Sequence, residues 1–290
     1  MSLPPTLLLG FIAGVTILLG LPVGRMRRPA PGLRVFLNAT AVGVLMFLFW
    51  DVLTAAWQPI EGALNAFHRG TGDLAPAIGY GLLFAAGLSV GLLSLVGYDR
   101  YIAHATRKPL RSGPGAMTVT EIPAPRRGVA SWSPPRRMAL LIAVGIGLHN
   151  FAEGLAIGQA AASSEIALAT VLVIGFALHN ATEGFGIVAP LAAEQGLDGV
   201  DARPSWGFLL GMAAIGGGPT FIGTAVGHSF TSEPLSVVFL TLAGGSIIYV
   251  IVQLLGVAAR AKRSELVIYG LLIGLLAGFI TDAVITAGGA

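Results

Sequence analysis

Two related strings decide how this sequence is interpreted: HNFAEG at His149–Gly154 and HNATEG at His179–Gly184. Each lies in an apolar segment that contains almost no other polar side chain. The His and the Glu of each string are four residues apart, which places them about one turn apart on one face of an α-helix. If the two helices are neighbours, two imidazoles, two carboxylates and two amides converge on one point. The predicted ligands of a divalent cation at this point are His149, Asn150, Glu153, His179, Asn180 and Glu183.

The composition predicts that this point lies inside a membrane. The 290 residues are 54% hydrophobic and only 11% charged, whereas soluble domains carry about 25% charged residues. The mean hydropathy is +0.81. Cysteine is absent, which excludes a disulfide framework and a thiolate metal site. The basic residues stand at the ends of apolar segments, so we interpret them as topology signals and expect no nucleic acid partner.

Eight segments are long enough to span a bilayer, which takes about 20 mainly apolar residues. We predict spans at residues 5–24, 35–57, 75–101, 138–161, 165–189, 205–229, 234–258 and 265–287. The predicted fold class is an all-α polytopic membrane protein with a single transmembrane domain over residues 1–290. Residues 58–74 are predicted to be a polar connection. Residues 104–136 are rich in Pro and Arg, which predicts a cytoplasmic, largely disordered loop.

The basic residues also predict the orientation. The loops that follow the first, third, fifth and seventh spans hold 16 of the 17 Lys and Arg residues, and only Arg69 lies elsewhere. Because cytoplasmic loops carry an excess of basic residues, we expect these loops to be cytoplasmic and both chain termini to lie outside. Seven or nine spans would destroy this asymmetry.

A weak internal similarity in residue spacing, called the echo below, indicates an inverted repeat. Gly43 and Asp51 in the segment 35–57 are eight residues apart, as are Gly245 and Gln253 in the segment 234–258. These two segments run in opposite directions in the predicted topology. A repeat that relates the first three spans to the last three would produce the echo and leave the fourth and fifth spans as a central pair, a 3+2+3 arrangement. Two positions alone do not distinguish a repeat from coincidence.

The chemistry of the two strings favours a metal site. Ionisable side chains cost roughly 2.5–3.5 kcal/mol each to insert at the membrane centre, so they mark functional sites by default. Imidazole nitrogen and carboxylate oxygen suit zinc and other first-row divalent ions. One such string alone is equally well explained by hydrogen bonds across a helix interface, but two strings in adjacent helices favour the metal. A relay of protons through His and Glu, without a metal, is a further alternative.

At these residues the sequence resembles the ZIP (Zrt/Irt-like) family of divalent metal transporters. HNFAEG is similar to the family's motif in helix 4, and HNATEG to its motif in helix 5, although Thr182 stands where the family often has Pro. Pro190 is similar to the family's Pro near the end of helix 5. The resemblance implies eight transmembrane helices, both termini outside, and a transport site, often binuclear, that is lined by the six residues of the two strings.

The sequence departs from the family's pattern at three places. Gly218, before Pro219, occupies the position where many bacterial members have a Glu that binds a second metal, so we expect a second metal to bind weakly or not at all. The loop at 104–136 holds only His104, whereas the family's loop is often rich in His. Met46 stands where some relatives place a ligand, although a lone Met in an apolar run more often fills space in the packing.

Further polar residues are candidates for a metal pathway that includes Met46. Asp51, expected near the outer end of its helix, either attracts cations or is a solvated terminus. His228 is a candidate transient ligand near the outer end of the segment 205–229, and Gln253 is a candidate at the inner exit. Asp282 is expected to be structural. The outer surface has a net acidic charge, which would raise the local concentration of cations.

The sequence as a whole predicts a transporter of a bacterial inner membrane that moves a divalent cation into the cytoplasm. Zinc is the favoured cargo; iron, manganese and Cd²⁺ are alternatives, and a homodimer is possible. An intramembrane metal-dependent enzyme would need a general base and oxyanion donors in addition to the ligands, and the sequence offers no such set. A non-transporting metal receptor would bind metal without flux.

Overall fold

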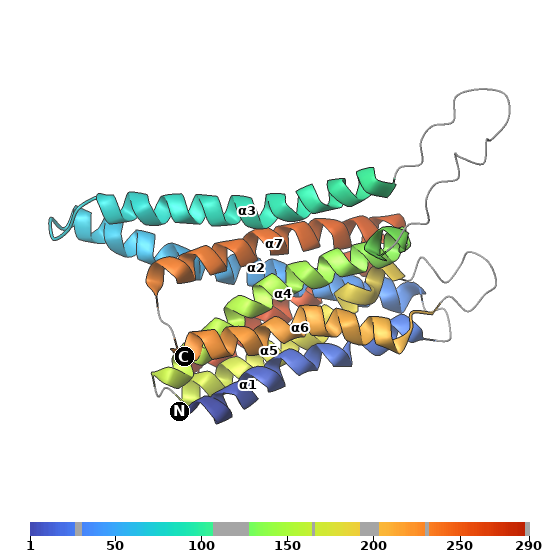
Figure 1. Cartoon of the computed structure of the whole chain (residues 1–290), viewed down its shortest axis with the longest axis horizontal. Helices are drawn as coiled ribbons and strands as arrows, with labels where there is room; N and C mark the ends of the chain where they lie inside the picture. Colours follow the sequence, from blue (N-terminus) through green and yellow to red (C-terminus); the bar gives the residue numbers. More distant parts are fainter. Residues whose placement is uncertain (27–30, 107–127, 164–165, 192–202, 230–231, 288–290) are drawn as a thin grey trace, which may run out of the picture.

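Eight long helices build the molecule. The computed structural model describes residues 1–26, 31–106, 128–163, 166–191, 203–229 and 232–287. Within these residues, eight helical segments are long and apolar enough to cross a membrane and no strand occurs. The predicted all-α polytopic class is therefore confirmed. Both chain termini lie at the same end of the helices (Figure 1), as an even number of crossings requires.

The helices begin and end close to the predicted positions, with exceptions at two connections. The elements are α1 (Leu3–Val15), the 3-10 helices η1 (Thr16–Leu19) and η2 (Leu21–Arg25), α2 (Pro31–His68), α3 (Ala75–Thr106), η4 (Gly128–Ser131), α4 (Pro134–Ala162), α5 (Ile166–Val188), α6 (Trp206–Ser229), α7 (Glu233–Arg260) and α8 (Ser264–Ala287). Ser133 caps α4, because its side chain accepts a hydrogen bond from the backbone N–H of Arg136.

The first exception is α2. Residues 58–68, predicted to be a polar connection, continue the helix. Pro59 lies inside it. Proline removes one backbone hydrogen bond and usually kinks a helix, but the next residue, Ile60, is only 3% exposed and is held by packing. Asp51 therefore lies in the middle of α2, and the expectation that it stands near a helix end is wrong.

The second exception is the connection between α3 and α4. The predicted loop at 104–136 is shorter, because α3 extends through Thr106 and α4 begins at Pro134. Just before α4, the ring of Trp132 packs edge-on against Phe208 of α6, with 5.3 Å between the ring centroids. Residues 107–127 lie outside the described residues, so the cytoplasmic, disordered character of the loop stays a prediction.

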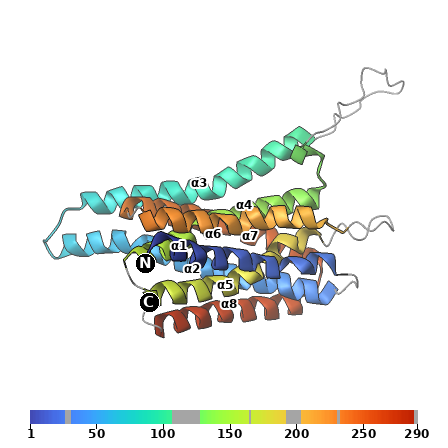
Figure 2. The ribbon, with the colours of Figure 1, turned by 60° about the horizontal axis from the view of Figure 1, so that its bottom comes forward.

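The helices pack into two groups of four. α4 packs along α6, and α1 and α5 complete this group. In the other group α2 packs along α8, and α3 packs along α7 and α2. α3 and α8 lie at opposite edges of the molecule (Figure 2). The groups meet chiefly where α7 contacts α4 and where α2 contacts α5.

Two glycines make equivalent close contacts, one between α2 and α8 and the other between α7 and α3. Gly43 of α2 lies directly against the backbone of α8 at Leu271, and Gly245 of α7 lies in the same way against the backbone of α3 at Leu88. In both places a Cβ atom would overlap a carbonyl oxygen. The echo in the sequence therefore reflects a structural repeat in which α2 corresponds to α7 and α8 corresponds to α3.

The two central helices, α4 and α5, also make equivalent contacts. Gly154 of α4 lies against the carbonyl oxygen of Thr220 in α6, and Gly184 of α5 lies against the carbonyl oxygen of Ile17 in η1. α4 thus corresponds to α5, and α6 corresponds to the segment formed by α1 and η1. The two strings that hold His, Asn and Glu are consequently equivalent positions of one repeated unit.

Candidate metal site

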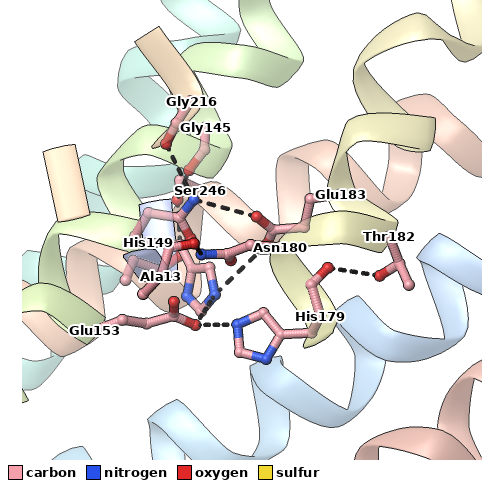
Figure 3. Close-up of polar contacts among 12 residues, drawn as sticks. Ala13, Gly145, His149, Glu153, His179, Asn180, Thr182, Glu183, Gly216 and Ser246 are labelled. Atoms are coloured by element: carbon pink, nitrogen blue, oxygen red, sulfur yellow. Dashed lines mark hydrogen bonds and ion pairs between the residues drawn. The ribbon is translucent and has the colours of Figure 1, made fainter. Parts of the chain in front are cut away.

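The six predicted ligands lie together where α4 and α5 pass each other. Figure 3 labels five of them: His149, Glu153, His179, Asn180 and Glu183. All six are buried, and the most exposed of them, His179, is 8% exposed. The prediction that the two strings converge is therefore correct in its geometry. Close packing makes this possible, because the glycine that ends each string lets the backbone of a neighbouring helix approach.

Glu153 joins the two imidazoles. Its Oε1 lies 2.5 Å from Nε2 of His179 and 2.8 Å from Nε2 of His149. The Oε1 of Glu183 lies 3.7 Å from the same Nε2 of His149. The two imidazole centroids are 6.0 Å apart. Two carboxylates and two imidazoles thus face one small volume.

The two Asn residues fix this volume to the neighbouring helices. The Nδ2 of Asn150 donates to the carbonyl oxygen of Gly216 at 3.0 Å and to Oε2 of Glu183 at 3.2 Å. The Nδ2 of Asn180 donates to the carbonyl oxygen of Ala13 at 3.1 Å. Sequence analysis did not find these two carbonyls, since a backbone acceptor has no signature in the side chains. They are related by the same repeat that relates α1 to α6.

Several buried polar atoms at this point have no hydrogen-bond partner. They are Nδ1 of His149, Oε2 of Glu153, Oε1 of Glu183 and the Oδ1 atoms of Asn150 and Asn180. Nearly all buried polar atoms in proteins are paired, so a cluster of unpaired acceptors calls for an explanation. Both amide groups point their donors at the backbone, which leaves their oxygens for a cation.

The donor set fits a divalent first-row ion such as zinc. Ligand atoms of His149, His179 and Glu183 all lie within 4.8 Å of one another. Zinc bonds to N and O are about 2.0–2.2 Å long, so two atoms on one ion are at most about 4.4 Å apart. Small side-chain shifts would therefore bring these atoms onto one ion. The ion pairs described for Glu153 and Glu183 involve histidine only, so a dication would balance both carboxylates.

The other candidates are mostly remote from this cluster. Met46 is 44% exposed on the surface of α2, and Gln253 is half-buried on α7 near its inner end. The Nε2 of His228 lies 3.0 Å from the carbonyl oxygen of Met1, so this ring holds the start of the chain against α6. A Cβ atom at Gly218 would meet nothing within 4 Å.

Asp51 is the exception among these candidates. It lines a cavity between α2, α5 and α8 that is also lined by His179, Thr182, Thr281 and Asp282. Sequence analysis gave Asp282 a structural role, whereas the structure places it in the same cavity as Asp51. Sequence spacing could not bring the two together, because the contact between α2 and α8 is a product of the fold.

The fold and the cluster define a multi-pass membrane protein with a buried cluster of His, Asn and Glu side chains between two helices. Residues 125–286 match the ZIP zinc transporter family. Since this match covers more than half of the chain, the protein belongs to the ZIP family. The resemblance inferred from the two strings is thereby confirmed, and the protein is a transporter and not an enzyme.

Curated relatives extend the similarity to nearly the whole chain. The chain is 29% identical over 278 residues to the zinc transporter ZupT of Escherichia fergusonii, covering 95% of this chain and 94% of the relative. It is 29% identical over 290 residues to the zinc transporter ZupT of Escherichia coli strain K12 / DH10B, covering 99% of both. The zinc transporter ZupT of Salmonella arizonae is 28% identical over 278 residues, 95% of this chain.

The anchored amides lead to a first prediction. Asn180→Ala is expected to weaken zinc binding about tenfold, because it removes one oxygen ligand and frees the site from α1. Asn38→Ala is a matched control, since the Nδ2 of the buried Asn38 donates to the carbonyl oxygen of Leu254 at 3.0 Å, away from the site. Competition with a zinc-sensitive dye in detergent would measure both affinities. Equal losses in the two variants would show that Asn180 is only structural.

Proposed function

We propose that this protein carries a divalent cation, with zinc as its cargo, across a bacterial inner membrane into the cytoplasm through the cluster between α4 and α5. The observation that carries the proposal is the buried convergence of two imidazoles and two carboxylates with unpartnered amide oxygens. The names of the relatives support zinc as the cargo. Imidazole nitrogens among the ligands disfavour Mg²⁺ and Ca²⁺, which prefer oxygen ligands only.

Contacts among the side chains themselves hold the cluster together. The contacts of Glu153 with His149 and His179 keep the ligands close. Imidazole binds metal through a nitrogen that carries no proton, so an arriving cation replaces these contacts and displaces protons. Because the carboxylate of Glu153 already contacts both imidazoles, a cation competes with these contacts, and this competition lowers its affinity and favours release.

The packing supports a particular form of alternating access. The 3+2+3 arrangement predicted from the sequence sets the first three and the last three helices apart from a central pair. The close packing of α4 with α6, and of α5 with α1 and η1, instead favours movement of α1, α4, α5 and α6 as one unit against α2, α3, α7 and α8. The ligands would travel with the first group, because Asn150 and Asn180 are anchored to its backbone.

The charges support the orientation predicted from the sequence. Arg25, Arg136, Arg260 and Arg263 lie at the ends of helices opposite to the chain termini. The guanidinium of Arg25 lies 5.1 Å from the ring centroid of Trp206, and aromatic and basic residues commonly mark a membrane interface. The basic end is then the cytoplasmic end, and both termini lie outside.

Reconstitution in liposomes tests the function. With a zinc-sensitive dye inside, the wild-type protein is expected to give saturable zinc influx, and Glu153→Gln is expected to reduce the initial rate at least 100-fold, since it removes a charged ligand from a buried site. Glu61→Gln, an exposed carboxylate near the end of α2, should transport as wild type does. Metal binding without flux would favour the receptor alternative, and equal flux in wild type and Glu153→Gln would place the route elsewhere.

A further inference from the structure

A cavity of about 80 Å³ lies directly beside the metal cluster, between α2, α5 and α8. A water molecule takes about 30 Å³ in the liquid, so the cavity has room for a partly hydrated ion. Its wall is largely apolar, with five polar side chains: Asp51, His179, Thr182, Thr281 and Asp282. The cavity and the metal cluster share the ring of His179.

The carboxylates in this cavity have no Lys or Arg beside them. Asp51 and Asp282 are half-buried and line the same cavity. In the described part of the chain, neither Asp51 nor Asp282 forms an ion pair with Lys or Arg, and no Lys or Arg lines the cavity. Like charges that share a low-dielectric cavity repel strongly, and a divalent cation between them would relieve this repulsion.

The remaining polar groups present acceptors to the cavity. The hydroxyl of Thr182 donates to the carbonyl oxygen of His179 at 2.7 Å, and the hydroxyl of Thr281 donates to that of Ala277 at 2.9 Å. Both hydroxyl protons are thus committed, and the lone pairs of the oxygens are free. The Nε2 of His179 contacts Glu153, and no hydrogen bond to its Nδ1 is found among the described residues.

The acidic end of the cavity faces the outside in the proposed topology. α2 and α8 both run outward, and Asp51 and Asp282 are the last residue that each contributes to the lining. A cation that enters from outside would therefore meet these two carboxylates before it meets His179 and the cluster behind it.

We propose that Asp51 and Asp282 bind a second divalent cation in this cavity, as a waiting position from which the ion passes His179 into the transport site. The proposal rests on the proposed transport function. The ligands are chiefly oxygens, so the ion keeps part of its hydration and binds more weakly than at the cluster. The role assigned to Asp282 changes accordingly, from structural to metal-binding.

Equilibrium dialysis of the full chain in nanodiscs, with Zn²⁺ and elemental analysis, tests the waiting position. The wild type is expected to bind a tight and a weaker ion. The double variant Asp51→Asn with Asp282→Asn should lose the weaker ion and keep the tight one, which also shows that it is folded. Asp73→Asn, an exposed acid outside the cavity, should keep both. In liposomes the double variant should raise KM about tenfold, equivalent to 1.4 kcal/mol, with the maximal rate unchanged.

The outcomes separate this proposal from the transport function. A double variant that retains both ions, or a wild type that binds one, overturns the waiting position and leaves the transport site intact. If the double variant does not fold, the single variants Asp51→Asn and Asp282→Asn test the waiting position. An unchanged affinity for the weaker ion in both single variants would overturn the proposal. Loss of the tight ion in Glu183→Gln, with the weaker one kept, supports both sites. If Glu183→Gln retains the tight ion, the transport site itself is wrong.

Discussion

We expect Glu183→Gln to lower the affinity of the proposed transport site for zinc by roughly 100- to 1000-fold. Removing one partner from a buried charged set costs about 3–5 kcal/mol, and 1.4 kcal/mol is a factor of ten. The substitution preserves the volume of the side chain and an oxygen atom near Nε2 of His149. The loss would therefore report the charge of the carboxylate and not a cavity or a broken helix contact.

Glu233→Gln is the matched control for this measurement. Glu233 also bonds a polar side chain, since the hydroxyl of Tyr80 donates to its Oε2 at 2.6 Å, but it is exposed and remote from the cluster. Titration with a zinc-sensitive dye of known affinity gives the Kd of both variants in the same detergent. A Kd for Glu183→Gln within threefold of wild type would contradict the role of this carboxylate as a ligand.

Two adjacent glycines in α6 provide the second strong test. Gly217 lies directly against the carbonyl oxygen of Gly14 in α1, whereas a Cβ atom at Gly218 would meet nothing within 4 Å. Gly217→Ala is expected to destabilise the protein by about 1–3 kcal/mol, because the obstacle is rigid backbone. Gly218→Ala should be neutral or stabilise by up to about 1 kcal/mol, since alanine favours a helix over glycine.

Thermal unfolding in detergent, followed by the helical circular dichroism signal, would compare these two variants with the wild type. Because the variants differ only in position along one turn, their helix propensities match and the difference reports the packing of α1 against α6. Equal melting temperatures would mean that α1 and α6 separate easily, which would contradict their movement as one unit.

The convergence of the candidate ligands was predictable because their spacing is local. Each string places His and Glu one turn apart whatever the rest of the chain does, and apolar flanks predict that both strings lie in the membrane. The number of spans and their directions followed from hydropathy and from the positions of Lys and Arg. These features depend on residue type and spacing alone, and the eight helices confirm the number of spans.

The features that escaped prediction depend on which helices touch. Asp282 became a neighbour of Asp51 only because α8 packs along α2, and no pattern within either helix contains that information. The carbonyls of Ala13 and Gly216 were invisible because every residue has one. The extension of α2 past Pro59 was missed because proline normally breaks a helix, and the burial of Ile60 outweighs that preference.

The inverted repeat places residues of unequal charge at equivalent positions of α2 and α7. Eight residues beyond Gly43 and its counterpart Gly245 stand Asp51 and Gln253, one a carboxylate and the other a neutral amide. The backbone around the site is thus repeated, but this negative charge is not. A cation approaching from the acidic side is attracted more strongly than one returning from the basic side, so the carrier would saturate at lower concentrations outside than inside. In the proposed carrier, the difference of one side chain between matched positions would make the two directions of transport unequal.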